Sequence, residues 1–219
     1  MSAVTIIGPD YSSYVRSIIL ALELKGVSYD RHMNGMTDIA ELKSEKHLSL
    51  HPFAKVPVLI HGDNCIFESA AILEYIDESF VGANLMSGSP AEFAKQRAWV
   101  QSYICYAYDP IFKGYLIPLL RRTFPKDKSL SEFSEAAFKR IQPILEKFEN
   151  AYENAAPFYN GSQPELIDML LVIMLDYLNM SPLEQDISRE FPKLKNMFVA
   201  YREREDFAAT IPESFQKSA

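Results

Sequence analysis

Residues 51–76 read HPFAKVPVLIHGDNCIFESAAILEYI, and this stretch decides the fold. The run VPVLI at 56–60 predicts a strand with a proline at its start, where a missing N–H is tolerated. HGDN at 61–64 is a turn sequence, and residues 65–67 predict the returning strand of a hairpin. Glu68 with Ser69 then opens a helix whose apolar residues recur at helical spacing.

The segment before this hairpin predicts a strand and a helix. Residues 3–8 (AVTIIG) are a short apolar run, closed by a Pro-Asp turn. Ser12 and Ser13 stand where a helix cap belongs, and apolar residues follow at i, i+3, i+4 and i+7. Gly26 suits a left-handed C-terminal cap, so the helix ends there.

A second strand and a short helix connect this unit to the hairpin. Apolar residues recur at even spacing in 27–33, as a strand requires. Asp38 and Glu41 form a capping box, which predicts a helix over 38–48. Through residue 80 the expected order is therefore strand, helix, strand, helix, two strands and a helix.

The spacing of apolar residues changes after residue 80. Residues 80–90 (FVGANLMSGSP) are a connector of small residues, and nearly everything beyond them shows helical spacing. We therefore predict an α/β domain over 1–80 and an all-helical domain over 89–219.

Two features of the helical part are specific. Pro110 and Pro118 are expected to kink or divide its first long helix. The longest apolar run, 166–175, is interrupted by Asp168 and is shorter than the about 18 residues that a membrane span needs. This run predicts the central helix of a core, and a membrane partner is not expected.

Composition indicates an ordinary globular protein. The 219 residues are 48% hydrophobic and 23% charged, which excludes a disordered tail, a collagen-like repeat and a disulfide scaffold. The net charge of −7 repels phosphate backbones, so nucleic acid is not an expected partner.

The cysteines indicate a reducing environment. Cys65 and Cys105 lie far apart, without CxxC spacing and without a secretory leader ahead of them. No disulfide framework and no metal site are therefore expected, Cys65 is assigned to the core, and a cytoplasmic location is predicted.

Three short motifs contain residues that could bind a ligand or take part in catalysis. For each of them a purely structural role is the alternative interpretation. Ser12 and Ser13 precede a helix whose free N–H groups favour an anion, although serines there can act as caps only. Val56–Pro57 is a place for a cis bond that presents the Val56 backbone to a peptide, or for an ordinary trans proline. Glu68–Ser69 offers a carboxylate and an anion site, or a plain helix cap.

Together these places resemble one family. SSYVRSIILALELKGVSYD (12–30), HPFAKVPVL (51–59) and the turn HGDN with FESAAILEYI (67–76) resemble the thioredoxin-like half of the cytosolic glutathione transferases in order, spacing and residue type. VPVL and ESAAIL match the family's Val-Pro and Glu-Ser-x-Ala-Ile motifs, and the similarity covers essentially the whole chain. The sequence is identified as a serine-type, zeta-, theta- or phi-like member of bacterial or fungal type.

The resemblance implies a role for each site residue. Ser12 corresponds to the catalytic hydroxyl, with Tyr11 as an alternative donor or a wall residue. Glutathione, the co-substrate, is held by Ser12, Lys55, Val56, Pro57, Glu68 and Ser69, with Lys43 and His51 as weaker candidates. Tyr11, Tyr106 and Tyr115 are the implied walls of a hydrophobic substrate site in a cleft between the domains, with packing in the core as the alternative for the tyrosines. Phe112 is assigned to the core.

The activity implied is attack of the glutathione thiolate on a small hydrophobic electrophile, as in detoxification, by a cytoplasmic homodimer that needs no metal. Phe53, in the loop before Val-Pro, is a candidate to insert between helices of a second subunit, or an aromatic residue that covers its own core. One alternative is a cis-trans isomerase of the maleylacetoacetate type, because ALELKGVSYD resembles the zeta class, although Tyr14 replaces the expected Cys. Another alternative is a non-catalytic glutathione-binding or structural module.

The start of the helix near residue 166 departs from the family pattern. The family places Ser or Thr three residues before a buried Asp, whereas this chain has Glu165 before Asp168. Asp168 is still expected to accept hydrogen bonds from backbone N–H groups at the helix start.

Overall fold

The computed structural model describes residues 3–32, 43–152, 158–159, 161 and 163–216. The chain forms two compact units, one made of residues 1–86 and 203–219 and the other of residues 87–202. The predicted fold class, an α/β unit followed by an all-helical unit, is confirmed.

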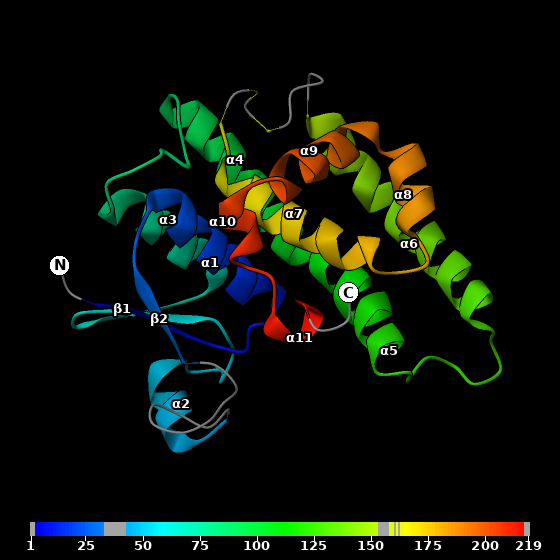
Figure 1. Ribbon diagram of the computed structural model, residues 1–219, viewed down its shortest axis with the longest axis horizontal. Coiled ribbons are helices and arrows are strands. Elements are labelled where there is room, and N and C mark those ends of the chain that lie inside the picture. The colour runs from blue at the N-terminus through cyan, green and yellow to red at the C-terminus, as the bar shows by residue number, and fades with distance from the viewer. Residues whose placement is uncertain (1–2, 33–42, 153–157, 160, 162, 217–219) are drawn as a thin grey trace. The chain divides into compact units, whose positions relative to one another are not determined.

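The first unit is built on a four-stranded sheet of order β2-β1-β3-β4. β1 runs parallel to β2 and antiparallel to β3, and β3 pairs antiparallel with β4. Helices α1 and α3 pack against each other on one side of the sheet, and α2 lies on the other (Figure 1). The bounds are β1 Val4–Ile7, α1 Ser13–Lys25, β2 Tyr29–His32, α2 Glu45–Leu50, β3 Val58–His61, β4 Asn64–Phe67 and α3 Ser69–Ser79.

Helix α1 shows why this unit is stable. Most of its apolar residues are fully buried, among them Ile18, Ile19 and Leu22. Gly26 ends the helix with a φ of 66°, and its N–H donates to the Glu23 carbonyl as a left-handed cap does. The cap predicted at Gly26 is therefore confirmed.

Helix α2 begins later than the predicted helix over 38–48. Ser44 is its N-cap, and the Ser44 hydroxyl accepts a hydrogen bond of 3.2 Å from the His47 N–H. The proposed capping box of Asp38 and Glu41 lies outside the described residues.

The C-terminal residues 203–219 group with the α/β unit, whereas the predicted division places them in the helical domain. α10 (Glu205–Ala208) packs against α1 (Figure 1), and α11 spans Glu213–Gln216. The physical reason is Arg16, which is fully buried and donates to the Thr210 carbonyl at 3.1 Å and to the Thr210 hydroxyl at 3.3 Å. Because these bonds give partners to Nε and Nη2 of a buried guanidinium, they help to hold the segment on α1.

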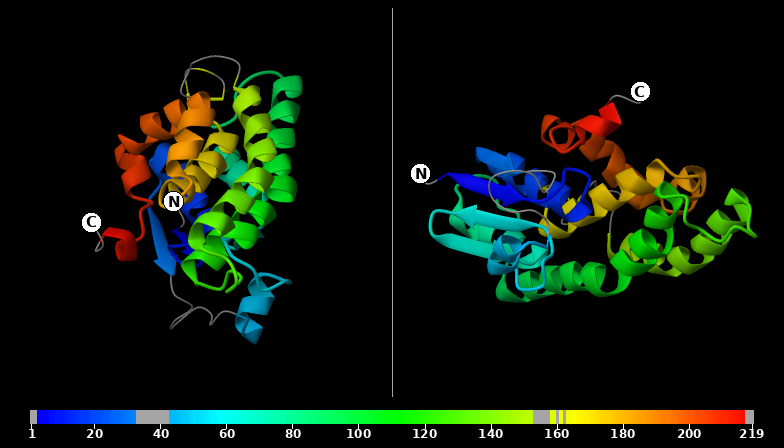
Figure 2. Two further views of the ribbon diagram at one scale, coloured as in Figure 1. Left: turned by 90° about the vertical axis from the view of Figure 1, so that its right-hand side faces the viewer. Right: turned by 90° about the horizontal axis from the view of Figure 1, so that it is seen from below.

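The second unit consists of helices packed around α7, as Figure 2 shows. The run 166–175 is buried, which confirms its assignment as the central helix of a core. In the described part of the chain, no helix is both long and apolar enough to cross a membrane. The bounds are α4 Pro90–Ser102, η1 Tyr103–Ala107, η2 Asp109–Leu116, α5 Ile117–Leu120, α6 Leu130–Ala151, α7 Leu166–Asn179, α8 Glu184–Glu190 and α9 Pro192–Arg202.

The first long helix of this unit changes its winding instead of breaking. After α4 it continues as the π-helical segments η1 and η2, and the intervening Tyr108 keeps right-handed helical dihedrals. Pro110 lies in η2 and has no N–H for the carbonyl four residues earlier. The wider π turn accommodates this missing bond without ending the helix.

Asp168 organises the start of α7, as predicted. Its carboxylate accepts from the Glu165 N–H at 2.8 Å, from the Tyr159 N–H at 3.1 Å and from the Tyr152 hydroxyl. Glu165 is itself buried and accepts from the Ser87 hydroxyl at 3.2 Å.

Candidate active site

Strand register brings three separate parts of the chain to one end of the sheet. Ile7, the last residue of β1, pairs with Val58 at the start of β3, and Val58 pairs with Phe67 at the end of β4. The segments that continue from these positions are 8–12, 56–57 and 68–69. These segments contain the main candidate glutathione-binding residues except Lys55, which immediately precedes the second of them; the weaker candidates Lys43 and His51 lie outside them.

Ser12 is the N-cap residue of α1, but its side chain makes no capping hydrogen bond. Its backbone completes the turn, because the Ser12 N–H donates to the Pro9 carbonyl and the Ser12 carbonyl accepts from Arg16. Ser13 is buried, whereas Ser12 is partly exposed. The Ser12 hydroxyl therefore lies beside the positive end of a helix and is not used as a cap.

Gly8 brings the loop before Ser12 against Val56. Its φ is 147°, and a Cβ at this position would lie 2.5 Å from Val15 Cγ2 and 3.0 Å from Val56 Cβ. A side chain does not fit in that space, and the φ is one that only glycine adopts readily. Gly8 thus lets the end of β1 pass close to the residue that precedes Pro57.

The Val56–Pro57 peptide bond is cis, as one of the two interpretations of this motif expects. Val56 is partly exposed and lies just outside β3. Within the described part of the chain, no hydrogen bond uses the Val56 N–H or C=O. Both groups are therefore available to a ligand.

Glu68 and Ser69 form the start of α3. Glu68 has a φ of 68°, its side chain makes no capping bond, and its carbonyl accepts from Ile72 at 2.9 Å. Ser69 is buried at the first position of the helix. A carboxylate thus stands exposed next to a helix N-terminus, which suits a ligand with both an ammonium and a carboxylate group.

Lys55 and Lys43 are exposed, and His51 is buried near them. Burial lowers the pKa of His51, although the Glu68 carboxylate acts to raise it. His51 Nδ1 also accepts from the Phe53 N–H at 3.2 Å, so this nitrogen carries no proton. The lysines are therefore better suited than His51 to bind a carboxylate at neutral pH.

Sequence reasoning missed His47, which is fully buried on α2. Its ring contacts the backbone of both Lys43 and Lys55. A single histidine in the six-residue helix EKHLSL gives no periodic or motif signal that could have revealed this role.

The three tyrosines assigned to a hydrophobic substrate site have different environments. Tyr11 is 58% exposed and Tyr106, on η1, is 70% exposed. Tyr115 is fully buried, and its hydroxyl donates to Ser134 at 3.2 Å. Tyr115 is therefore a core residue of the helical unit.

Cys65 corrects another expectation. It is exposed on β4, one of the two edge strands, and its thiol donates to the Leu50 carbonyl at 3.5 Å. The assignment of Cys65 to the core is wrong, because side chains alternate between the two faces of a strand and the return strand is short.

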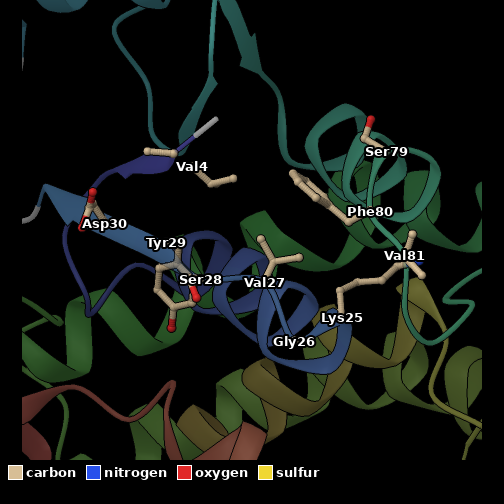
Figure 3. A pocket seen from close by; sticks show the side chains of 11 residues that line it. Val4, Lys25, Gly26, Val27, Ser28, Tyr29, Asp30, Ser79, Phe80 and Val81 are labelled. Carbon is tan, nitrogen blue, oxygen red and sulfur yellow. The ribbon is translucent and has the colours of Figure 1, made fainter. Parts of the chain in front are cut away.

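A pocket of about 520 Å³ lies at the C-terminal end of α1, where Lys25 and Gly26 line it (Figure 3). Lys25 contributes to its wall but is paired with Asp77 at 2.6 Å, so its charge is already compensated. None of the candidate glutathione-binding residues lines it. Apolar side chains of Val4, Val27, Phe80 and Val81 contribute much of its wall.

Two family models match this chain. The glutathione S-transferase N-terminal domain matches residues 10–78, and the glutathione S-transferase C-terminal domain matches residues 116–209. The chain belongs to the glutathione S-transferase family.

Curated relatives and solved structures agree with this result. The chain is 26% identical to a probable glutathione S-transferase of Solanum tuberosum, with 92% of this chain and 95% of the relative covered. It is 27% identical to glutathione S-transferase U3 of Arabidopsis thaliana, with 96% and 89% covered. The theta class glutathione S-transferase of Xanthomonas axonopodis pv. citri, solved with glutathione bound, has a TM-score of 0.78 at 23% identity, with 96% and 98% covered.

The predicted family and the predicted enzyme class, a transferase, are confirmed by these matches. The assignment to a serine-type subgroup of bacterial or fungal type stays a prediction.

Proposed function

We propose that this glutathione S-transferase conjugates the thiolate of glutathione to small hydrophobic electrophiles, and that the Ser12 hydroxyl stabilises the thiolate. The observation that carries the proposal is that Ser12 lies at the N-terminus of α1 with no capping bond from its side chain. The hydroxyl can therefore donate to a ligand sulfur.

In this proposal glutathione is held along its whole length. The Val56 N–H and C=O pair with the cysteinyl C=O and N–H, as neighbouring strands do. Glu68 binds the γ-glutamyl ammonium group, and Ser69 with the first N–H groups of α3 binds the γ-glutamyl carboxylate. Lys55 reaches the glycyl carboxylate, and Lys43 is a second cation for the same group.

The chemistry follows from the acidity of the thiol. A free thiol has a pKa of about 8.5 and is only a few per cent ionised at neutral pH. A hydrogen bond from Ser12 and the positive end of α1 both favour the anion, so they lower that pKa and orient the sulfur. The thiolate then attacks the electrophilic carbon, and the protein supplies no covalent nucleophile.

For the second substrate we propose Tyr11 and Tyr106 as wall residues, because both expose large aromatic surfaces. Tyr115 is not part of this proposal, since it is buried and bonded to Ser134.

Replacing Ser12 by Ala tests the proposal. The loss of a hydrogen bond to a charged sulfur costs about 1.5–3 kcal/mol, so the rate should fall roughly ten- to a hundredfold while glutathione still binds within a few-fold. The pKa of bound glutathione should rise, which is measured by titrating the thiolate absorbance in the ultraviolet.

Ser13→Ala and Tyr11→Phe are the matched controls, because these hydroxyls flank Ser12 in the chain. Neither variant should shift the thiolate titration. A shift in Tyr11→Phe but not in Ser12→Ala would make Tyr11 the donor. No shift in any of the three would favour the non-catalytic module.

We further propose a cytoplasmic homodimer that acts in detoxification. Phe53 supports the dimer, because it is 72% exposed in the loop after α2, where an aromatic side chain is available to a partner. Phe53→Ala should shift the protein towards monomer in analytical ultracentrifugation. An unchanged dimer would remove Phe53 from the interface.

A further inference from the structure

His47 connects two parts of the chain that are separated by most of α2 and the following loop. The imidazole is fully buried. Its Nδ1 lies 3.0 Å from the Lys43 backbone nitrogen, and its Nε2 lies 2.9 Å from the Lys55 carbonyl oxygen. One side chain therefore fixes the backbone of both lysines that are candidates for binding the glycyl carboxylate.

The two partners determine the protonation of the ring. The Lys43 N–H can only donate, so Nδ1 accepts and carries no proton. The Lys55 carbonyl can only accept, so Nε2 carries a proton and donates it. His47 is therefore neutral in this arrangement, with its proton on Nε2.

The bond to the Lys55 carbonyl also sets the direction of the Val56 N–H. These two groups belong to one planar peptide unit, in which a trans bond makes C=O and N–H point in opposite directions. Because Nε2 holds the carbonyl on one side, the Val56 N–H points away from His47. This N–H makes no hydrogen bond within the described residues.

We propose that His47 is a positioning residue for glutathione: it aims the Val56 N–H at the cysteinyl carbonyl and holds Lys43 and Lys55 beside the glycyl carboxylate. The inference rests on the proposed function. His47 acts through the backbone of these residues and does not touch the substrate.

The backbone around His47 supports this role. Lys43 has a φ of 71° and Ala54 a φ of 47°, conformations that residues with a Cβ rarely adopt. They persist only where neighbouring bonds fix them. An apolar residue of similar size at position 47 would fill the space but would leave the Lys43 N–H and the Lys55 carbonyl without this partner.

The test measures the binding of two ligands by titration calorimetry. Glutathione contains the cysteinyl carbonyl and the glycyl carboxylate, whereas γ-glutamylcysteamine lacks both and keeps the γ-glutamyl group and the thiol. In His47→Leu the dissociation constant for glutathione should rise roughly five- to tenfold, the effect of one lost hydrogen bond. The constant for γ-glutamylcysteamine should change by less than about twofold by the same reasoning, since that ligand makes neither contact.

Conservative variants add a second readout. His47→Gln keeps an N–H that can donate to the Lys55 carbonyl, so it should restore most of the affinity for glutathione. His47→Asn keeps only an acceptor placed like Nδ1 and should not restore it. Ser49→Ala is the matched control, because it removes another bond on α2, the 2.7 Å bond from the Ser49 hydroxyl to the Lys46 carbonyl.

The outcomes separate the two proposals. Wild-type protein that binds neither ligand would overturn the proposed function. Wild-type protein that binds both, with an equal loss for both ligands in His47→Leu, would overturn the inference and leave His47 as a packing residue. A selective loss for glutathione that Gln restores supports His47 as the positioning residue.

Discussion

Glu68 has an unusual backbone conformation, and its side chain makes no capping hydrogen bond. Its φ of 68° lies in a region that costs a residue with a Cβ about 1–3 kcal/mol, and such residues cluster where a ligand is held. The adjacent Ser69 is buried at the first position of α3. The start of one helix and one exposed carboxylate thus belong to neighbouring residues.

Glu68→Gln and Ser69→Ala should raise the Michaelis constant for glutathione more than they lower turnover. In the proposed function both groups bind the γ-glutamyl end, which does not change during the reaction, so substrate and transition state lose the same contacts. Steady-state kinetics at varied glutathione concentration separates the two constants. A fall in turnover with an unchanged Michaelis constant would show that these residues act on the reacting sulfur instead.

Gly8→Ala should reduce both stability and glutathione affinity, because the new Cβ would meet Val15 at 2.5 Å and Val56 at 3.0 Å. Gly26→Ala is the matched control: its φ is also positive, at 66°, but a Cβ there meets nothing within 4 Å. The control should lose about 1–2 kcal/mol of unfolding free energy. Gly8→Ala should lose about 1–3 kcal/mol more by overpacking, as measured by urea denaturation. Equal losses of unfolding free energy in the two variants would show that the space between Gly8 and Val56 can hold a methyl group.

At the scale of elements, α1 connects the candidate site to the C-terminal segment. Ser12 is the N-cap residue of α1, without a capping bond from its side chain. Arg16, one turn later, donates to Thr210 and lies with its guanidinium carbon 5.9 Å from the centre of the Phe207 ring. The guanidinium is fully buried, so its bonds and its packing both hold α10 in place.

Arg16→Leu should loosen residues 205–216 while the sheet stays folded. Hydrogen exchange read by mass spectrometry should show faster exchange in α10, because the Thr210 carbonyl loses its buried donor. Arg204→Leu is the control: its guanidinium pairs with Asp206 in the same segment but is 36% exposed, so little change is expected. Unchanged exchange in Arg16→Leu would mean that packing alone holds the segment.

Sequence predicted those elements whose signals are local. The strand and helix over 3–26, the hairpin around HGDN and the helix from Ser69 follow from periodicity, turn residues and caps, and the structure contains each of them. The winding of η1 and η2 was not predicted, because Pro110 indicates an irregular step but not whether the helix breaks or widens.

The association of α10 and Thr210 with α1 was not predicted either. It depends on the contact between Arg16 and Thr210, which are 194 residues apart in the chain. For the same reason the sequence left open whether Tyr115 is buried and gave no sign of the contacts of His47, since each depends on a partner from another turn or loop.

At the scale of the whole molecule, stability is expected to depend on one buried carboxyl in the helical unit. Burial raises the pKa of Asp168 to about 7 from an ordinary 3.8, and the hydrogen bonds from Tyr152, Glu165 and Tyr159 only partly oppose this effect. The folded chain therefore holds a proton on Asp168 at pH values where the unfolded chain has released it.

This shift predicts how the free energy of unfolding changes with pH. Below about pH 4 the carboxyl is protonated in both states, so its contribution to stability is fully present. Between about pH 4 and pH 7 the unfolded chain binds fewer protons than the folded chain, and the contribution is lost by up to about 1.4 kcal/mol per pH unit.

Asp168→Asn cannot titrate, so its own unfolding free energy should lack this decrease. Urea denaturation at several pH values gives the unfolding free energy of each protein. The value for wild type minus the value for Asp168→Asn should be largest near pH 4 and smallest near pH 7. A difference that instead grows as the pH rises would mean that the three hydrogen bonds outweigh burial and keep Asp168 ionised.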